Sequence, residues 1–263
     1  MDQWQVRRRV IAFDLDGTLA PSKSPAPDKI VELLDQLLDK YQVCVISGGK
    51  FEQFEKQLLS GLKATPEKLE KLHIMPTCGT RYYRFDIAKK TWQQVYAEDF
   101  NEAEKKKIIS ALNKGFDDLD YREKKTWGEC IEDRGSQVTF SVFGQDIVDE
   151  LGEEGVSLKE AWDPDNTKKQ KLRDYIAPLI PEFEVRVGGV TSIDVTKLGI
   201  DKGYGMKKLM ELLGVSKEEI LFIGDRLVEG GNDYPVKAMG IDCKEISHWQ
   251  ETALAIEDIL RAS

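Results

Sequence analysis

Two carboxylates stand two positions apart at the end of a short apolar run near the start of the chain. In IAFDLDGTL, residues 11–19, a strand that continued through Asp14 and Asp16 would point both side chains the same way. Two like charges side by side repel each other, so this pair needs a compensating cation or serves a chemical purpose. Asp14 and Asp16 are therefore the first candidates for catalytic chemistry.

Two later apolar runs also end in polar residues, since VCVI leads to Ser47 and ILFIG leads to Asp225. Ligands bind beyond the carboxyl ends of the strands in an open parallel sheet, so these side chains and Asp14 could meet there. Carboxylates from different strand ends, with backbone carbonyl and water oxygens, form a hard oxygen site that suits Mg²⁺ rather than Zn²⁺. A bound Mg²⁺ would also relieve the repulsion between the first two aspartates.

Phosphoryl transfer is the chemistry that these residue types suit. Beside Mg²⁺, Asp14 could attack a phosphate and form an acyl phosphate, while Asp16 protonates the leaving oxygen and later deprotonates water. Hydrogen-bond donors and a fixed positive charge would stabilise the phosphoryl oxygens. The candidates for these contacts are Thr18 and Gly48 and, as catalytic residues, Ser47 and Lys202. The expected metal ligands or outer-shell residues are Asp14, Asp16, Asp225, Asn232 and Asp233.

Each of these residues also has an ordinary structural interpretation. DGT is a common turn after a strand, and Ser47 could be a loop residue. Lys202 could be a solvated helix lysine, and GGND could be a tight turn that requires positive φ. These interpretations are weaker jointly, because the four segments occur in one order and each lies at an expected strand end or helix start.

Alternating strand and helix signals would position these residues. RVIAF and VCVI predict buried strands, and DKIVELLDQLLDKY and FEQFEKQLL predict helices after them. The C-terminal region repeats the pattern with DKGYGMKKLMELLG as a helix, ILFI as a strand and WQETALAIEDILRA as a closing helix. This order is typical of an α/β fold with a doubly wound, Rossmann-like parallel sheet and crossover helices.

The sequence pattern changes in the middle of the chain. RYYRFDI, TWQQVYA and QVTFSVF alternate aromatic, apolar and charged residues, as strands do in an antiparallel sheet with one solvated face. We therefore expect a catalytic core made of residues 1–81 and 189–263. Residues 82–188 are expected to form an inserted α+β cap domain.

Composition excludes several other function classes. The formal charge of −9 disfavours nucleic-acid and anionic lipid partners, and no apolar run approaches the roughly 20 residues of a membrane span. No signal-peptide pattern is evident, and the four cysteines are widely separated without a CxxC pair. With two histidines, a His-rich zinc site and a Ser-His-Asp triad are poorly supported. We expect a cytoplasmic protein whose carboxylates carry its chemistry.

Four segments together resemble the motifs of the haloacid dehalogenase superfamily. They are DLDGTL, the Ser47 turn, Lys202 and GDRLVEGGND, and the insert lies between the second and third of them, as in subfamily IIB members with the large α/β cap. The resemblance covers the whole chain. It implies a doubly wound core, Mg²⁺, an aspartyl nucleophile at Asp14 and an acid/base at Asp16. By family analogy the protein would be a monomer or a cap-mediated homodimer.

Within this superfamily the chain is most similar to eukaryotic-type phosphomannomutases. The likeness rests on GGKFEQFEKQL, GGVTSIDV and the long GGND loop. It implies that Ser192 and Asp194 lie near the sugar or its phosphate, and that Arg134, in IEDRGSQVTFSVFGQ, corresponds to a cap arginine of the mutases.

Departures from the mutase pattern favour a phosphatase. A mutase must hold a sugar bisphosphate in two orientations, which requires several cap arginines. This chain has Gln145 and Lys23 where that pattern has arginines, and it has no arginine from Glu150 to Lys171. The sequence thus predicts a Mg²⁺-dependent phosphohydrolase of a small phosphorylated metabolite such as a sugar phosphate. A phosphomannomutase is the alternative, with a clamp rebuilt from Arg134, Lys168, Lys169 or Arg173, and a non-catalytic phosphosugar-binding protein is a third interpretation.

Overall fold

The computed structural model describes residues 8–262, which form two compact units. One unit contains the described residues up to Ala97 and from Ile200 onward, and the other is Glu98–Gly199. Residues 1–7 and Ser263, which the expected core includes, lie outside the described residues.

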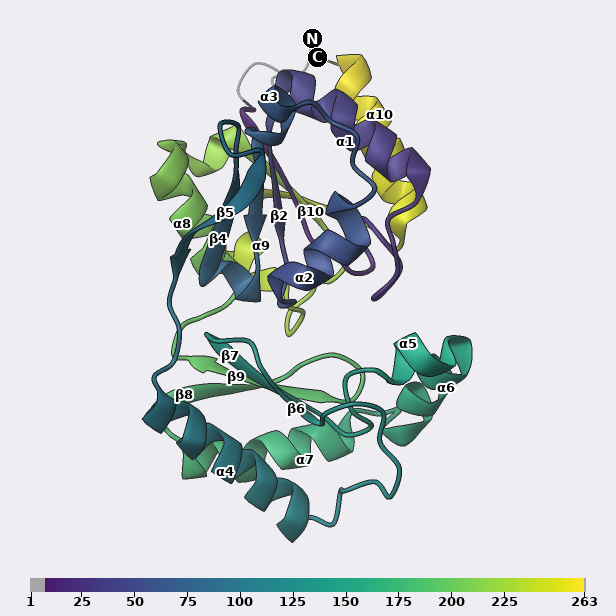
Figure 1. Ribbon diagram of the computed structural model, residues 1–263, viewed down its shortest axis with the longest axis vertical. Helices are drawn as coiled ribbons and strands as arrows, with labels where there is room; N and C mark the ends of the chain where they lie inside the picture. The colour runs from purple at the N-terminus through teal and green to yellow at the C-terminus, as the bar shows by residue number, and fades with distance from the viewer. Residues whose placement is uncertain (1–7, 263) are drawn as a thin grey trace. The chain divides into compact units, whose positions relative to one another are not determined.

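The first unit is an α/β layer structure around a seven-stranded sheet of order β11-β10-β1-β2-β3-β4-β5 (Figure 1). Its strands are β1 (Val10–Phe13), β2 (Gln42–Ile46), β3 (Leu72–Met75), β4 (Arg81–Asp86), β5 (Thr91–Ala97), β10 (Ile220–Gly224) and β11 (Asp242–Glu245). The five strands from β11 to β3 are parallel. This arrangement confirms the expected doubly wound parallel sheet.

Helices cover both faces of this sheet. They are α1 (Asp28–Lys40), α2 (Phe51–Phe54), the π-helical turn η1 (Glu55–Leu59), α3 (Pro66–Leu69), η2 (Thr77–Gly79), α8 (Lys202–Leu213), η4 (Lys217–Glu219), α9 (Tyr234–Ala238) and α10 (Trp249–Ala262). In β1, Ile11 and Phe13 pack with α1 and α10, whereas Val10 and Ala12 pack with α8 and α9. All four residues of β1 are fully buried, because a parallel strand covered on both faces must be apolar throughout.

The hairpin β4–β5 belongs to the large sheet, although its sequence was expected in the insert. Strand β4 pairs antiparallel with β3 through Ile74 and Tyr83. The ring of Phe51 stacks on Tyr83 with centroids 4.0 Å apart, which attaches α2 to the hairpin. The alternating pattern therefore identifies half-exposed strands correctly but not the sheet they join. The first division between the units falls after Ala97 rather than after residue 81.

The second unit contains an antiparallel sheet of order β6-β7-β9-β8. Its elements are α4 (Glu102–Asp118), β6 (Ile131–Asp133), β7 (Gln137–Ser141), α5 (Ile147–Leu151), α6 (Glu153–Trp162), α7 (Thr167–Ile176), η3 (Ala177–Leu179), β8 (Phe183–Val187) and β9 (Ser192–Lys197). The apolar face of this sheet packs on α4 and α7 through residues such as Phe116, Phe140 and Leu172 (Figure 1). Because β9 pairs with both β7 and β8, the second division falls after Gly199 rather than after residue 188.

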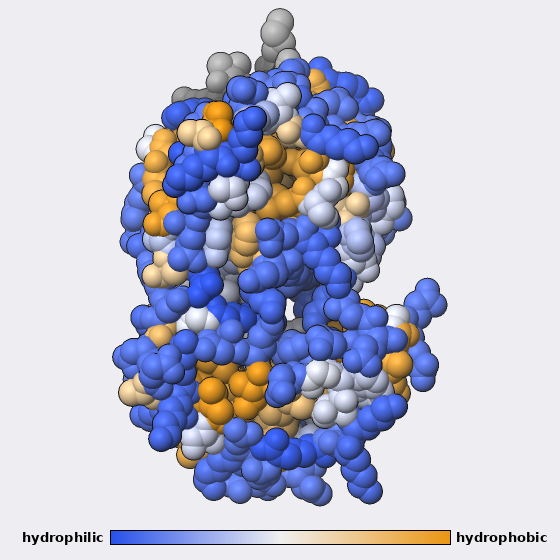
Figure 2. Space-filling view, in the orientation of Figure 1, coloured by the Kyte–Doolittle hydropathy of each residue, from blue (hydrophilic) through white to orange (hydrophobic). Residues whose placement is uncertain are grey.

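The surface is largely hydrophilic, as Figure 2 shows for one face, with separate apolar patches on each unit. Such scattered apolar surface is ordinary for a folded chain. Across residues 8–262, the structure contains no helix with the length and apolar character needed to cross a membrane.

A buried histidine links the middle of the sheet to the hairpin. His73 on β3 is fully buried; its Nδ1 lies 2.7 Å from the Tyr82 hydroxyl and its Nε2 lies 2.8 Å from Gln42 Oε1. An amide oxygen can only accept, so Nε2 carries the hydrogen and Nδ1 accepts from Tyr82. Burial, helped by the nearby charge of Arg84, lowers the pKa of His73 from 6.5 to about 3.

His73 is expected to contribute less to the free energy of unfolding as the pH drops below about 6.5. Because the pKa of His73 is lower in the folded state, the unfolded chain binds more protons between about pH 3 and 6.5. This group alone can remove at most about 1.4 kcal/mol per pH unit in that window. Urea denaturation at several pH values measures it. His73→Gln should unfold more easily at neutral pH but lose less stability on acidification, and parallel pH profiles for the two proteins would refute the assignment.

Candidate active site

Polar residues follow the carboxyl ends of three parallel strands and lie at one edge of the large sheet, as the sequence predicts. Asp14 follows β1, and its backbone N–H donates to Ile223 O at 3.0 Å. Ser47 follows β2 and is buried, with its backbone N–H donating to Met75 O at 3.3 Å. Asp225 follows β10. Their common position results from the parallel register of β10, β1 and β2.

A buried cluster of charges lies at this edge. Lys202 Nζ lies 2.5 Å from Asp14 Oδ1 and 2.6 Å from Asp233 Oδ1. Asp14 is 3% exposed, Lys202 1% and Asp233 0%. Burying charges costs more free energy than an ion pair usually returns, so such a group is weak evidence for stability and points to function instead.

Two glycines allow the carboxylates to approach. A Cβ on Gly17 would lie 2.6 Å from Asp225 Oδ2, and a Cβ on Gly224 would lie 2.5 Å from Asp233 Oδ2. Gly17 also has φ +83°, a conformation that favours glycine. The glycine of DGT therefore makes room for a carboxylate from a distant strand end as well as forming a turn.

The carboxylates of Asp14, Asp225 and Asp233 could hold a divalent cation. One oxygen from each lies within 4.8 Å of the others. The ammonium group of Lys202 contacts two of these carboxylates, and the exposed Arg226 lies beside the third, with its Nε 3.8 Å from Asp225 Oδ2. An all-oxygen donor set fits Mg²⁺, as the sequence predicts.

The pKa values of the cluster follow from burial and mutual repulsion. Burial raises the pKa of Asp14 to about 7, although Lys202 opposes this and Asp233 adds to it. Burial, followed by repulsion from Asp233, also raises the pKa of Asp225. For Lys202, burial favours the neutral amine, but its two carboxylate partners outweigh burial and raise the pKa of the ammonium group. Lys202 thus stays charged while Asp14 lacks full charge compensation.

Asp16 has different partners from those expected. Strand β1 ends at Phe13, so the alternation that would place the two aspartates together does not extend to Asp16. Its Oδ1 accepts from Lys23 N at 2.8 Å and from Gln57 Nε2 at 3.0 Å, and its Oδ2 accepts from Gln53 Nε2 at 2.7 Å. The side chain of Asp16 is not among the three carboxylates that could share a cation.

Of the other residues predicted at this sheet edge, some contact the charged cluster and others do not. Thr18 is fully buried, and its hydroxyl donates to Asp14 Oδ2 at 3.3 Å. Ser47 Oγ accepts from Gly49 N at 3.3 Å, within the turn that also contains the half-buried Gly48. Asn232 is exposed, whereas Asp233 next to it is fully buried and contacts Lys202. In GGND, Asp233 is therefore the residue that enters the site.

The cap candidates gather on the polar face of the second sheet. Ser192 and Asp194 are two apart on β9, so their side chains share a face, and Thr139 Oγ1 donates to Asp194 Oδ1 at 2.7 Å. Arg134 follows β6, and its Nε donates to Glu132 Oε2 at 2.7 Å. Since Glu132 is the cross-strand partner of Thr139, the three candidates belong to one polar surface.

Sequence reasoning assigned no role to Gln53 and Gln57, which contact Asp16. The available signal was their position, four residues apart, in the quoted segment GGKFEQFEKQL. Such spacing places two side chains on one helix face but does not predict which residues they contact.

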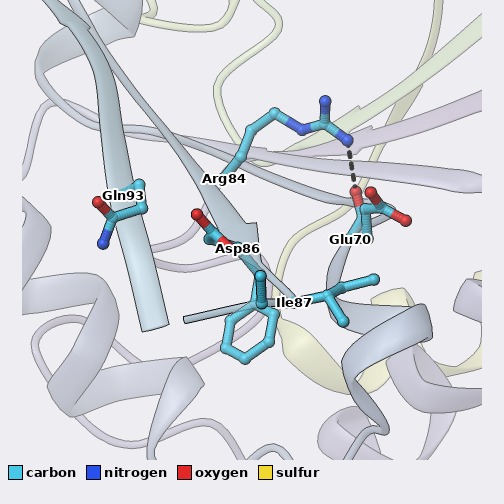
Figure 3. Close-up of a pocket in the computed structure, with 7 residues that line it drawn as sticks. Glu70, Arg84, Asp86, Ile87 and Gln93 are labelled. Carbon is cyan, nitrogen blue, oxygen red and sulfur yellow. Dashed lines mark hydrogen bonds between the residues drawn. The ribbon is translucent and has the colours of Figure 1, made fainter. Parts of the chain in front are cut away.

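A surface pocket of about 410 Å³ lies elsewhere, at the tip of the β4–β5 hairpin (Figure 3). Arg84 Nη2 donates to Glu70 O there at 3.0 Å, and Asp86, Ile87 and Gln93 also line it. Because β4 runs antiparallel to β3, its end at Asp86 lies at the sheet edge opposite Asp14. This pocket contains none of the residues singled out by the sequence.

Comparison with known proteins agrees with this geometry. The family model for haloacid dehalogenase-like hydrolases matches residues 11–235. The chain is 27% identical over 239 residues to a phosphomannomutase of Galdieria sulphuraria, covering 90% of this chain and 86% of the relative. It is also 27% identical over 252 residues to phosphomannomutase 1 of Homo sapiens, covering 92% and 87%.

Solved structures share the fold. The chain aligns with the Plasmodium falciparum IMP-nucleotidase at a TM-score of 0.70 and 16% identity, covering 98% of this chain and 70% of that one. A haloacid dehalogenase-like hydrolase from Bacteroides thetaiotaomicron aligns at a TM-score of 0.62 and 16% identity, covering 96% and 100%. At such identities the likeness establishes the architecture alone.

Mg²⁺ is expected to bind more tightly as the pH rises from about 6 to about 8, because Asp14 must lose a proton before it can hold the ion. Above the pKa of Asp14, about 7, the affinity should level off. Isothermal titration calorimetry in two buffers of different ionisation enthalpy measures both the affinity and the released protons. Equal affinity at both ends of this pH range would contradict the expectation.

Two variants that each remove one carboxylate test whether Mg²⁺ binds at the carboxylate cluster or elsewhere on the surface. Asp225→Asn should weaken Mg²⁺ binding, whereas Asp258→Asn, which removes an exposed helix carboxylate paired with Arg261, should leave it unchanged.

Proposed function

Because the chain belongs to the haloacid dehalogenase-like hydrolase family, we propose that it is a Mg²⁺-dependent phosphohydrolase of a small phosphorylated metabolite, such as a sugar phosphate. The observation that carries this proposal is the buried contact of Lys202 with Asp14 and Asp233, with Asp225 beside them. This combination offers a nucleophile, a fixed positive charge and carboxylates for a metal ion at one sheet edge.

The proposed reaction has two phosphoryl transfers. In the first, an Asp14 carboxylate oxygen attacks phosphorus, the ester P–O bond breaks, and Asp16 gives its proton to the departing oxygen. In the second, Asp16 takes a proton from water, whose oxygen attacks the phosphorus of the acyl phosphate. The P–O bond to Asp14 then breaks, which releases inorganic phosphate and restores both carboxyl groups.

Neighbouring groups support these steps. Lys202, in contact with Asp14, supplies positive charge that stabilises the phosphoryl oxygens in the transition state. Thr18, already in contact with Asp14, and Ser47 would donate hydrogen bonds to the same oxygens. A Mg²⁺ ion held by Asp14, Asp225 and Asp233 would supply charge neutralisation for an anionic substrate.

Water is the proposed acceptor because the cap cations expected to hold a second phosphate are already engaged or replaced. Arg134 already donates to Glu132, and the two side chains are 12% and 18% exposed. Gln145, in place of an arginine of the mutase pattern, is uncharged, and its Nε2 donates to Cys130 O at 3.5 Å. A substrate phosphate would have to compete with Glu132 for Arg134.

A phosphomannomutase remains the second candidate, because the curated relatives reported above carry that name. The cations available to rebuild a clamp are largely engaged. Lys169 Nζ donates to Gly189 O at 3.1 Å, Lys168 Nζ lies 4.8 Å from the centroid of the Trp162 ring, and Arg173 contacts Asp174. These contacts favour the hydrolase over the mutase.

Asp14→Asn is expected to lower turnover of phosphate esters by about 10⁴-fold or more, because the amide cannot act as the nucleophile. Phosphate release in the presence of Mg²⁺ measures this, with circular dichroism to check folding. Asp258→Asn, an exposed change of the same type, should keep full activity. If the Asp14→Asn variant still hydrolysed esters at about a tenth of the normal rate, Asp14 would be excluded as the nucleophile.

The acceptor can be identified by giving the enzyme mannose 1-phosphate or glucose 1-phosphate together with the matching 1,6-bisphosphate. Phosphorus NMR follows inorganic phosphate and hexose 6-phosphate in one sample. We expect steady formation of inorganic phosphate and little 6-phosphate. Isomerisation without phosphate release would establish the mutase, and binding with neither product would indicate a phosphosugar-binding protein.

A further inference from the structure

The carboxyl group of Asp16 is enclosed by donors from two parts of the first unit. Gln53 on α2 donates to Oδ2, whereas Gln57 in the π-helical turn η1 and the backbone N–H of Lys23 both donate to Oδ1. We infer that Gln53 and Gln57 are positioning residues, which orient Asp16 for proton transfer to the leaving oxygen. This inference rests on the proposed function, in which Asp16 exchanges protons.

The two amides form a closed set of hydrogen bonds. Gln53 Nε2 donates to Asp16 Oδ2 and to Gln57 Oε1, both at 2.7 Å. Gln57 Nε2 donates to Asp16 Oδ1 at 3.0 Å and to Ser24 O at 2.9 Å. An amide group has two hydrogens, so both donors are fully used by these four bonds. Neither side chain can turn without breaking two of them.

Burial makes this arrangement costly to disturb. Gln57 is 3% exposed, and a buried amide that loses its partners costs about 1–3 kcal/mol. Its backbone carbonyl accepts from Ala26 N at 2.6 Å, so the turn η1 also holds the loop that follows Asp16. Within that loop Lys23 has φ +53°, which directs its N–H toward Asp16 Oδ1.

The network also adjoins the turn that contains Ser47. A Cβ on Gly49 would lie 2.1 Å from Gln53 Oε1, so the amide of Gln53 occupies the space that any other residue type at position 49 would need. The amide that donates to Asp16 therefore lies close to the backbone of Gly49, in the turn that contains Ser47. Displacing a catalytic group by about 1 Å can cost about 10²-fold in rate, so this support has consequences for catalysis.

The test compares two phosphate esters that need a general acid to different degrees. The p-nitrophenolate group of p-nitrophenyl phosphate leaves readily without a proton, whereas the alkoxide of glucose 6-phosphate requires one. The parameter kcat/KM reports the steps up to the first transfer, so it isolates leaving-group departure from the later attack of water.

The variants are Gln57→Met and Gln53→Met, which keep side-chain length but remove the donors. We expect kcat/KM for glucose 6-phosphate to fall by about tenfold or more, since general acid catalysis contributes about 10²–10⁴-fold. For p-nitrophenyl phosphate we expect a fall of less than about threefold.

Gln94→Met is the matched control, because Gln94 is exposed on β5, where its Oε1 accepts from the Tyr83 hydroxyl. It should leave both esters unaffected. Activity on p-nitrophenyl phosphate reports whether each variant is folded.

Two outcomes would overturn the inference, and they are distinguishable. If the unmodified enzyme hydrolyses both esters but the Gln53 and Gln57 variants lose both equally or neither, the glutamines do not position the acid and the proposed function stands. If the unmodified enzyme with Mg²⁺ hydrolyses neither ester, the proposed function fails, and the role of the glutamines fails with it.

Discussion

The burial of Lys202 between two carboxylates is the interaction on which the geometry of the candidate site depends. Its Nζ contacts Asp14 and Asp233, and all three side chains are removed from water. Removing one partner from such a group costs about 3–5 kcal/mol. The end of β1, the start of α8 and the segment after β10 must therefore meet within hydrogen-bond distance. The same closeness brings Asp225 near enough to share a cation with the two aspartates.

The fold meets this constraint through close backbone contact at the turn after β3. A Cβ on Gly79 would lie 2.4 Å from Gly205 Cα, so α8 can approach the turn because both residues are glycines. Cys78 in this turn has φ +56°, and its N–H donates to Ser47 O at 2.9 Å. One strained turn thus supports both the helix that starts at Lys202 and the loop of Ser47. Strain of this kind persists where surrounding contacts hold it, often near functional sites.

The proposed proton transfer and the proposed choice of acceptor rest on residues in different parts of the chain. Asp16 is oriented by amide and backbone donors in the first unit, apart from the charge cluster. The second unit presents a polar sheet face, where Arg134 is paired with Glu132 and Asp194 with Thr139. The proposed phosphoryl transfer to Asp14 uses residues of the first unit, and the proposal that water is the acceptor rests on the contacts that already engage the cations of the second unit.

The sequence by itself determined the parallel core and most of the candidate site at its edge, because strand ends and helix starts are local patterns and a parallel sheet brings its strand ends together. Asp14, Asp225 and Lys202 were found in this way. The sequence also predicted Asp233 as a metal ligand or outer-shell residue, but only the tertiary structure shows its contact with Lys202. Tertiary structure alone decided that β4 and β5 extend the large sheet and that Gln57 contacts Asp16. Period-two alternation shows that a strand has one covered face but not which sheet covers it. Contacts between residues far apart in sequence depend on how the layers pack, which no local pattern encodes.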